Sequence, residues 1–97
     1  MDDALFDWDD ANIGHIAEHD VTPEEAEEAM LGDLFKYDFD SEVGDEKRWS
    51  YLAETSQGRI LRVLITVRGE RMRVVTAFDP PRNQKLLYLE MKAGQHE

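Results

Sequence analysis

Apolar and polar residues alternate along several stretches of the chain, and this period of two predicts β-strands. The clearest stretches are residues 49–55, 59–67 and 72–78, which are joined by short turns that contain glycine. Shorter stretches of the same kind cover residues 4–8 and 34–39. Because short turns connect strands that run in opposite directions, we predict an antiparallel sheet of three to four strands.

Capping residues predict two helices before the main strands. Asp9 can accept hydrogen bonds from the free N–H groups of a helix that starts after it and closes at Asp20. The run Thr22-Pro23-Glu24-Glu25 has a threonine cap, a proline at the first helical position and a glutamate three residues after the cap. This capping box predicts a second helix that ends at Gly32. The acidic residues 40–46 are predicted to form an exposed loop.

The chain after Pro80-Pro81 predicts one more helix, over residues 82–92, because its leucines recur at helical spacing. Helices before and after a run of antiparallel strands give the α+β class. The chain has 97 residues and no low-complexity linker, so we expect residues 1–97 to form a single domain. The predicted core consists of Phe6, Trp8, Ile13, Ile16, Trp49, Leu52, Val63, Ile65, Val74 and Leu86.

Charge divides the chain into two parts. Residues 1–46 carry 17 acidic and 1 basic side chain, whereas residues 47–97 carry 5 acidic and 10 basic ones. The net charge of −11 repels nucleic acid at long range, but a local basic face can still bind phosphate. Arginine outnumbers lysine, and its planar fork suits phosphate oxygens.

Composition excludes several classes of protein. The absence of cysteine excludes a disulfide framework, a thiol nucleophile and a cysteine-based zinc site. No apolar run is long enough to cross a bilayer, and the acidic start does not have the pattern of a signal peptide. We therefore expect a cytoplasmic protein that does not contact membranes.

Three segments resemble a known family. Residues 8–25, WDDANIGHIAEHDVTPEE, resemble the start W-D-x-x-N-I-x-H-I-x-x-H-G-V-T-x-E-E of BrnT-like proteins, the toxin half of a type II toxin–antitoxin pair. Residues 58–69 are similar to the hairpin G-R-L-L-x-V-x-x-T-x-R-G of that family. Residues 73–77, followed by Arg82, Lys85 and Tyr88, parallel R-V-I-T-A-R-x…R-x-x-R-x-x-Y.

The resemblance implies a compact RelE-like fold and a ribonuclease that needs neither a metal ion nor a cofactor. It also implies a cognate DNA-binding antitoxin as partner, RNA as substrate, and a homodimer or a heterotetramer with the antitoxin as the assembly. The chain departs from the family where Phe78 replaces an arginine and where Leu86-Leu87 replaces a basic pair. These changes remove positive charge, so an alternative function is a catalytically weakened member that acts as an acidic protein-binding module. A stand-alone acidic interaction protein is a third possibility.

RNA cleavage without metal requires a base for the 2′-hydroxyl proton, cations for the phosphorane charge and an acid for the leaving oxygen. His15 and His19 are four residues apart, share one helix face and can carry protons near neutral pH. The phosphate would be held by Arg62 and Arg73 of the strands and by Arg82 and Lys85 of the last helix. The further RNA contacts expected are Arg48, Arg68 and Tyr88.

Each of these residue types also has a structural interpretation. The strand arginines can form ion pairs with the acidic part of the chain, and the histidines can pack in the core or at a helix end. Two histidines without a third spaced ligand do not indicate a metal site.

Overall fold

The computed structural model describes residues 5–38 and 41–95. In chain order the elements are α1 (Asp10–Ala17), α2 (Pro23–Leu31), β1 (Leu34–Lys36), β2 (Ser41–Val43), β3 (Glu46–Glu54), β4 (Ile60–Arg68), β5 (Arg71–Phe78) and α3 (Arg82–Gln95). The strands form one antiparallel sheet in the order β1-β3-β4-β5, with β2 also paired to β3. The α+β class is confirmed, and the sheet has five strands where three to four were predicted.

The additional strand is β2, so the prediction of a loop over residues 40–46 is wrong. Val43 pairs with Glu46 across a two-residue turn, and Ser41 pairs with Arg48. Gly44 lies in this turn with a φ of +63°, a left-handed conformation that glycine adopts without a steric penalty. Alternation does not reveal β2 because all three of its residues are exposed.

Two other predicted strands are shorter in the structure. The strand predicted from residue 34 ends at Lys36, and Phe39 lies outside the described residues. In place of a strand over residues 4–8, Phe6 forms a single parallel bridge with Met72. Met72 donates to the Leu5 carbonyl and accepts from the Asp7 amide, so this segment covers part of the outer edge of β5.

The predicted cap at Asp9 and the predicted capping box at Thr22 are both confirmed, and Asp9 also forms a capping box with Asn12. The Asp9 carboxylate accepts from the amides of Ala11 and Asn12, and the Asn12 side chain accepts from the Asp9 amide. Thr22 and Glu25 make the corresponding pair at the start of α2. The first helix ends at Ala17, earlier than predicted.

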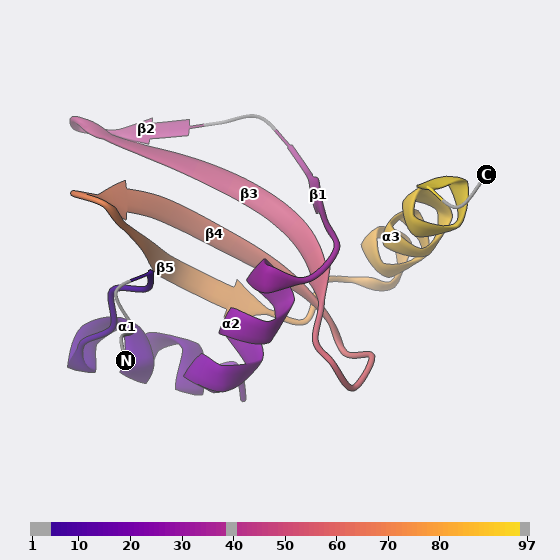
Figure 1. Cartoon of the computed structure of the whole chain (residues 1–97), viewed down its shortest axis with the longest axis horizontal. Coiled ribbons are helices and arrows are strands. Elements are labelled where there is room, and N and C mark those ends of the chain that lie inside the picture. The colour runs from indigo at the N-terminus through magenta and orange to yellow at the C-terminus, as the bar shows by residue number, and fades with distance from the viewer. Residues whose placement is uncertain (1–4, 39–40, 96–97) are drawn as a thin grey trace.

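The sheet separates two layers of unequal size. In Figure 1, α1 and α2 lie together on one side of the sheet, whereas α3 stands apart near the end of β1. The main core fills the side of α1 and α2, where Ile16, Ala26 and Ala29 pack against Val63 and Val74. On the other side, the Tyr88 ring of α3 contacts the Phe35 ring of β1 edge-on at 5.5 Å.

The predicted core is mostly confirmed, with two errors. Trp8 and Trp49 pack against the core while half-buried, and the other confirmed residues are Phe6, Ile16, Leu52, Val63, Ile65 and Val74. Ile13 is 38% exposed because α1 turns Asn12 and Ile16 toward the protein. Leu86 is 47% exposed because α3 turns Tyr88 inward.

Arg59 joins three segments that are distant in sequence. Its guanidinium donates to the Asp20 carbonyl at 2.7 Å, to the Glu25 carboxylate at 3.1 Å and to the Asp79 carboxylate at 2.8 and 3.1 Å. The pKa of Glu25 is lowered, first by the hydrogen bond from the Thr22 amide and then by Arg59. The same guanidinium is the main cause of the lowered pKa of Asp79. Arg59 therefore ties the α1–α2 connection and α2 to the segment that leads into α3.

We expect Arg59→Ala to lower the free energy of unfolding by about 2 kcal/mol, because several charge-assisted hydrogen bonds are lost at a partly exposed site. Urea denaturation measures this change. The matched control is Arg71→Ala, which removes an exposed arginine for which no ion pair is found within residues 5–38 and 41–95. The control should stay within about 0.5 kcal/mol of wild type, and equal effects of both changes would contradict the prediction.

Candidate functional site

One face of the sheet, opposite α1 and α2, is only partly covered. Alternation along the strands places Arg48, Ser50, Arg62, Leu64 and Arg68 on this face, and we call these residues the open sheet face. A groove of about 470 Å³ crosses it beside α1, and a narrower one of about 160 Å³ adjoins Asp38 and Trp49. Arg48 and Leu64 line both grooves, so the two grooves adjoin at these side chains.

Two arginines of the open sheet face share one carboxylate. Arg48 Nε lies 2.8 Å and Arg68 Nη2 lies 3.4 Å from the Glu46 carboxylate. The hydrogen bond from Arg48 is the main cause of a lowered pKa for Glu46. The side chain of Arg68 is still 56% exposed, so its guanidinium can be reached from solvent. This part of the groove therefore holds two positive charges and one negative charge.

Arg62 is held by three neighbours. Its Nε donates to the Ser50 hydroxyl at 3.0 Å, and its Nη2 lies 3.2 Å from the Asp38 carboxylate. The guanidinium carbon lies 4.9 Å from the centre of the Tyr37 ring, within the range of a cation–π interaction. These contacts fix the orientation of the planar fork before any ligand arrives, which lowers the entropic cost of phosphate binding.

Arg73 connects the sheet to α1. Its two terminal nitrogens donate to the two carboxylate oxygens of Asp9, each at 3.0 Å, and Asp7 lies 3.6 Å away. The pKa of Asp9 is lowered mainly by this hydrogen bond. Nearby, the Asn12 amide donates to the carbonyls of Asp7 and Val74. Although Arg73 lines the wider groove, its side chain is only 10% exposed and its fork is already bound to a carboxylate.

The Asp9–Arg73 pair predicts a pH dependence of stability. Because folding lowers the pKa of Asp9, the pair stabilises the protein above the carboxyl's ordinary pKa of 3.8, and this contribution is lost as pH falls through the folded value. Asp9→Asn retains a good N-cap but removes the charge. We expect the variant to be less stable than wild type at pH 7, and the difference to shrink below about pH 4. Urea denaturation at several pH values measures this, and a constant difference would contradict it.

The two histidines lie at the edge of the open sheet face. His15 is exposed on α1 and lines the wider groove together with Arg48 and Arg68. The His19 ring lies 5.7 Å from the His15 ring and 5.8 Å from the ring of Phe78. Phe78 pairs in register with Arg62, so the histidines flank the same face as the arginines. Among residues 5–38 and 41–95, no three metal-ligating side chains form a cluster.

The structure places the predicted residues of α3 away from this groove. Tyr88 is fully buried, and its hydroxyl lies 3.1 Å from the Asp33 carbonyl and 3.2 Å from the Glu54 carboxylate. Burial is the main reason that the pKa of Tyr88 is raised to about 12. Arg82 and Lys85, in the first turns of α3, are not among the described residues that line the groove. The fold thus brings His15, Arg48, Arg68 and Arg73 to one groove, with Arg62 in the adjoining groove and His19 beside His15.

The groups that orient these arginines were not predicted from the sequence, namely Tyr37, Asp38, Glu46 and Ser50. Alternation from Arg48 to Ser50 could have placed Ser50 on the same face. Asp38 and Tyr37 carry no such signal because they follow the end of β1.

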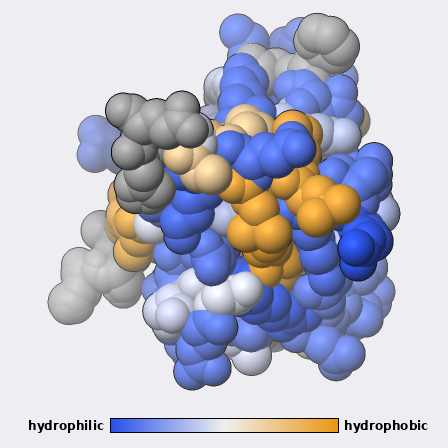
Figure 2. Space-filling view, turned by 90° about the vertical axis from the view of Figure 1, so that its right-hand side faces the viewer, coloured by the Kyte–Doolittle hydropathy of each residue, from blue (hydrophilic) through white to orange (hydrophobic). Residues whose placement is uncertain are grey.

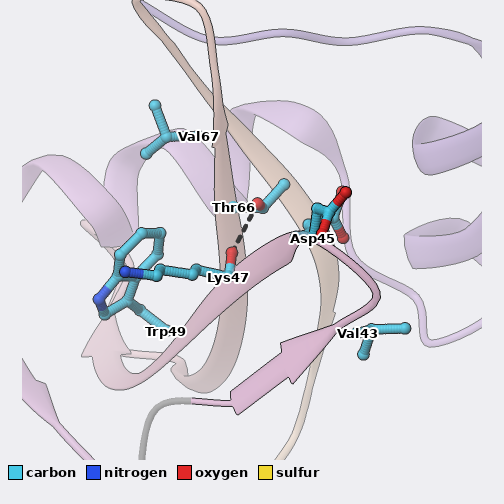
Figure 3. A pocket seen from close by; sticks show the side chains of 7 residues that line it. Val43, Asp45, Lys47, Trp49, Thr66 and Val67 are labelled. Atoms are coloured by element: carbon cyan, nitrogen blue, oxygen red, sulfur yellow. Dashed lines mark hydrogen bonds between the residues drawn. The ribbon is translucent and has the colours of Figure 1, made fainter.

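A separate groove, of about 540 Å³, lies where β2 and β3 meet the end of β4, and Figure 3 shows its lining. Its side chains include Val43, Lys47, Trp49 and Val67, and the Thr66 hydroxyl donates to the Lys47 carbonyl at 2.7 Å. No histidine or arginine is among its described lining residues. We therefore assign the candidate site to the open sheet face.

No helix in the described part of the chain is long and apolar enough to cross a membrane.

Comparison with known proteins identifies one family. The family model described as "Ribonuclease toxin, BrnT, of type II toxin-antitoxin system" matches residues 8–83, well over half of the chain. Comparison with curated proteins and with solved structures gave no match. The matched range includes both histidines and all arginines of the open sheet face, and it ends before Lys85 and Tyr88.

Proposed function

The chain belongs to the BrnT family, the ribonuclease toxins of type II toxin–antitoxin systems, and from this premise we propose that it is a metal-independent endoribonuclease whose site is the open sheet face. The observation that carries this proposal is that Arg48, Arg68 and His15 line one groove, while Arg62 lines a smaller groove that shares Arg48 with it. Three guanidiniums can bind a phosphodiester and offset the charge that develops on phosphorus during cleavage.

Protons are carried by the histidines in this proposal. His15 takes the proton of the RNA 2′-hydroxyl, and the 2′-oxygen then attacks the adjacent phosphorus and expels the 5′-oxygen. His19 is the candidate acid for that leaving oxygen because its ring is 5.7 Å from that of His15. Glu46 is a poorer base, since Arg48 lowers its pKa and stabilises its charged form.

The remaining residues have supporting roles. Arg73 holds the start of α1 in place through its ion pair with Asp9. Because His15 lies on α1, this ion pair also positions His15 at the groove. Membership of a type II family implies an antitoxin partner. We place the protein in the cytoplasm, neutralised by its cognate antitoxin, with a homodimer or a heterotetramer with the antitoxin as the assembly.

The test is incubation of the purified protein with labelled mixed-sequence RNA, with and without EDTA. We expect cleavage that resists EDTA and leaves 2′,3′-cyclic phosphate ends. Cleavage that EDTA abolishes would contradict metal independence. Intact RNA at micromolar protein would contradict the nuclease itself.

One observation favours the alternative of a weakened enzyme that acts as a protein-binding module. Arg48, Arg62 and Arg68 are each paired with a carboxylate, so RNA must compete with Glu46 and Asp38 for them. A stable complex with the antitoxin together with no RNA cleavage would favour this alternative.

A further inference from the structure

Trp49 of β3 lines three grooves. The largest is the groove of about 540 Å³ in Figure 3, which we call the Trp49 groove. The others are a groove of about 260 Å³ beside β2 and the groove of about 160 Å³ that contains Arg62. In the sheet, β2 pairs with residues 46–48 of β3 and β1 pairs with residues 51–53, so Trp49 lies at the junction between these two strands. The three grooves therefore adjoin at Trp49.

The Trp49 side chain is half-buried and remains accessible from the Trp49 groove. It packs against the core, and alternation places it on the same side of β3 as Lys47, which is exposed. Figure 3 shows Lys47 beside the Trp49 ring, and both residues also line the groove beside β2. Val43 and Val67, which are 57% and 53% exposed, are the other apolar residues of the lining. A flat ligand can therefore reach an aromatic ring between apolar walls.

The two ends of the sheet differ in their chemistry. Figure 2 views the molecule from the side of α3 and shows a band of apolar side chains surrounded by hydrophilic residues. The lining of the groove at that end includes the carboxylates of Glu28, Asp33 and Glu54. Lys92 of the same lining is paired with Glu54 at 2.6 Å. The β2–β3 turn lies at the opposite end in Figure 1, and there the Trp49 groove adjoins the arginines of the open sheet face. This end is the one that suits an anionic polymer.

The charges of the Trp49 groove favour a base over a phosphate. Its lining carries the carboxylates of Asp45 and Glu46 against one cation, Lys47. Glu46 also lines the wider groove of the open sheet face, where Arg48 pairs with it at 2.8 Å. Carboxylates repel phosphate but accept hydrogen bonds from the amino groups of bases. Phosphate is therefore expected on the arginines, and an uncharged aromatic ring in the Trp49 groove.

We propose that Trp49 stacks on an unpaired base of the RNA whose phosphate is bound by the arginines of the open sheet face. RNA as the ligand rests on the proposed function, whereas the aromatic platform rests on the position and exposure of Trp49. Proteins that bind single strands hold the bases on aromatic side chains and the backbone in a basic groove. Arg48 and Trp49 are consecutive in β3 and point to opposite sides, so one nucleotide can place its phosphate on the first and its base on the second. The substrate is therefore single-stranded RNA.

The fluorescence of Trp49 tests the stacking directly. The chain has two tryptophans, so Trp8→Phe leaves Trp49 as the only indole. The ligand is a 2′-O-methyl RNA of about six nucleotides, which cannot be cleaved because it has no free 2′-hydroxyl, and its counterpart is an abasic strand with the same number of phosphates. We expect the intact strand to quench Trp49 and to bind at least about 10-fold more tightly than the abasic strand. Equal quenching and affinity for both strands would overturn the proposal.

Trp49→Leu tests the aromatic ring, because leucine keeps an apolar side chain against the core but has no flat face. Anisotropy of the labelled strand should show binding about 10-fold weaker than that of wild type, whereas Trp49→Phe should stay within about 3-fold. The matched control, Trp8→Phe, changes a tryptophan that stacks on Phe6 and donates to Glu27, and it should bind as wild type does. Circular dichroism checks that each variant is folded. A folded Trp49→Leu variant that binds as tightly as wild type would overturn the proposal, and the fluorescence test decides it if this variant does not fold.

Binding of an uncleavable RNA separates this proposal from the proposed function. Cleavage of ordinary RNA together with no base-dependent quenching would overturn the stacking site and leave the nuclease proposal in place. Base-dependent quenching without cleavage would support the stacking site and contradict the nuclease. A duplex of the same sequence should bind at least about 10-fold more weakly, because its bases are already paired and stacked. Equal binding of duplex and single strand would overturn the proposal.

Discussion

Replacement of Arg62 by alanine is expected to lower the rate of RNA cleavage about 100-fold or more. Removal of one preoriented donor to a developing charge costs a factor of this size in other enzymes. Ser50, Asp38 and Tyr37 hold the Arg62 guanidinium in one orientation, so no other side chain can take its place without rearrangement. Single-turnover cleavage of labelled RNA measures the effect.

Two variants control for charge and for folding. Arg62→Lys keeps the charge but loses the fork, so we expect an intermediate rate, about 10-fold below wild type. Arg71→Ala removes an exposed arginine outside both grooves of the open sheet face and should cleave as wild type does. If Arg62→Ala were as active as wild type, the site could not lie on the open sheet face.

Tyr88→Ala should produce the largest loss of stability, about 3–5 kcal/mol in the free energy of unfolding. The side chain is fully buried, and its removal leaves a cavity between α3 and β1 where its ring contacts Phe35. A domain of this size has only about 5–15 kcal/mol of stability, so the variant will be partly unfolded under mild conditions. Urea denaturation followed by circular dichroism measures the change.

Tyr88→Phe distinguishes a structural role from a contact with RNA. It keeps the ring and removes only the hydroxyl that faces Asp33 and Glu54, so we expect a loss of about 1–2 kcal/mol. Cleavage of RNA by this folded variant should equal that of wild type. A loss of activity without a loss of stability would show that the hydroxyl contacts RNA after all.

The ion pairs have a consequence for how this family member can bind RNA. Most of the negative charge lies in residues 1–46, yet Asp9, Asp38 and Glu46 from that part contact arginines of β3, β4 and β5. The strand arginines therefore do not form an unshielded basic face. Phosphate has to displace or share these carboxylates, and RNA affinity should accordingly be sensitive to salt.

Sequence patterns that involve residues close together in the chain were sufficient to predict much of the fold. The Thr22-Glu25 capping box predicted the start of α2, because a cap satisfies N–H groups only three residues away. Alternation predicted β3, β4 and β5, since one face of each lies against the core. The exposed β2 has no buried face and therefore no pattern, and its pairing with β3 was not predicted.

By itself, the sequence determined the two N-terminal helices, the three long strands, the last helix, the family and the set of charged side chains available for chemistry. Only the tertiary structure decided which partner each charged side chain binds. Arg73 pairs with Asp9, 64 residues away along the chain, whereas Arg62 pairs with Asp38, 24 residues away. Alternation identifies the face on which a strand arginine lies but not the carboxylate that packing brings to it, because that contact depends on how distant segments fold together.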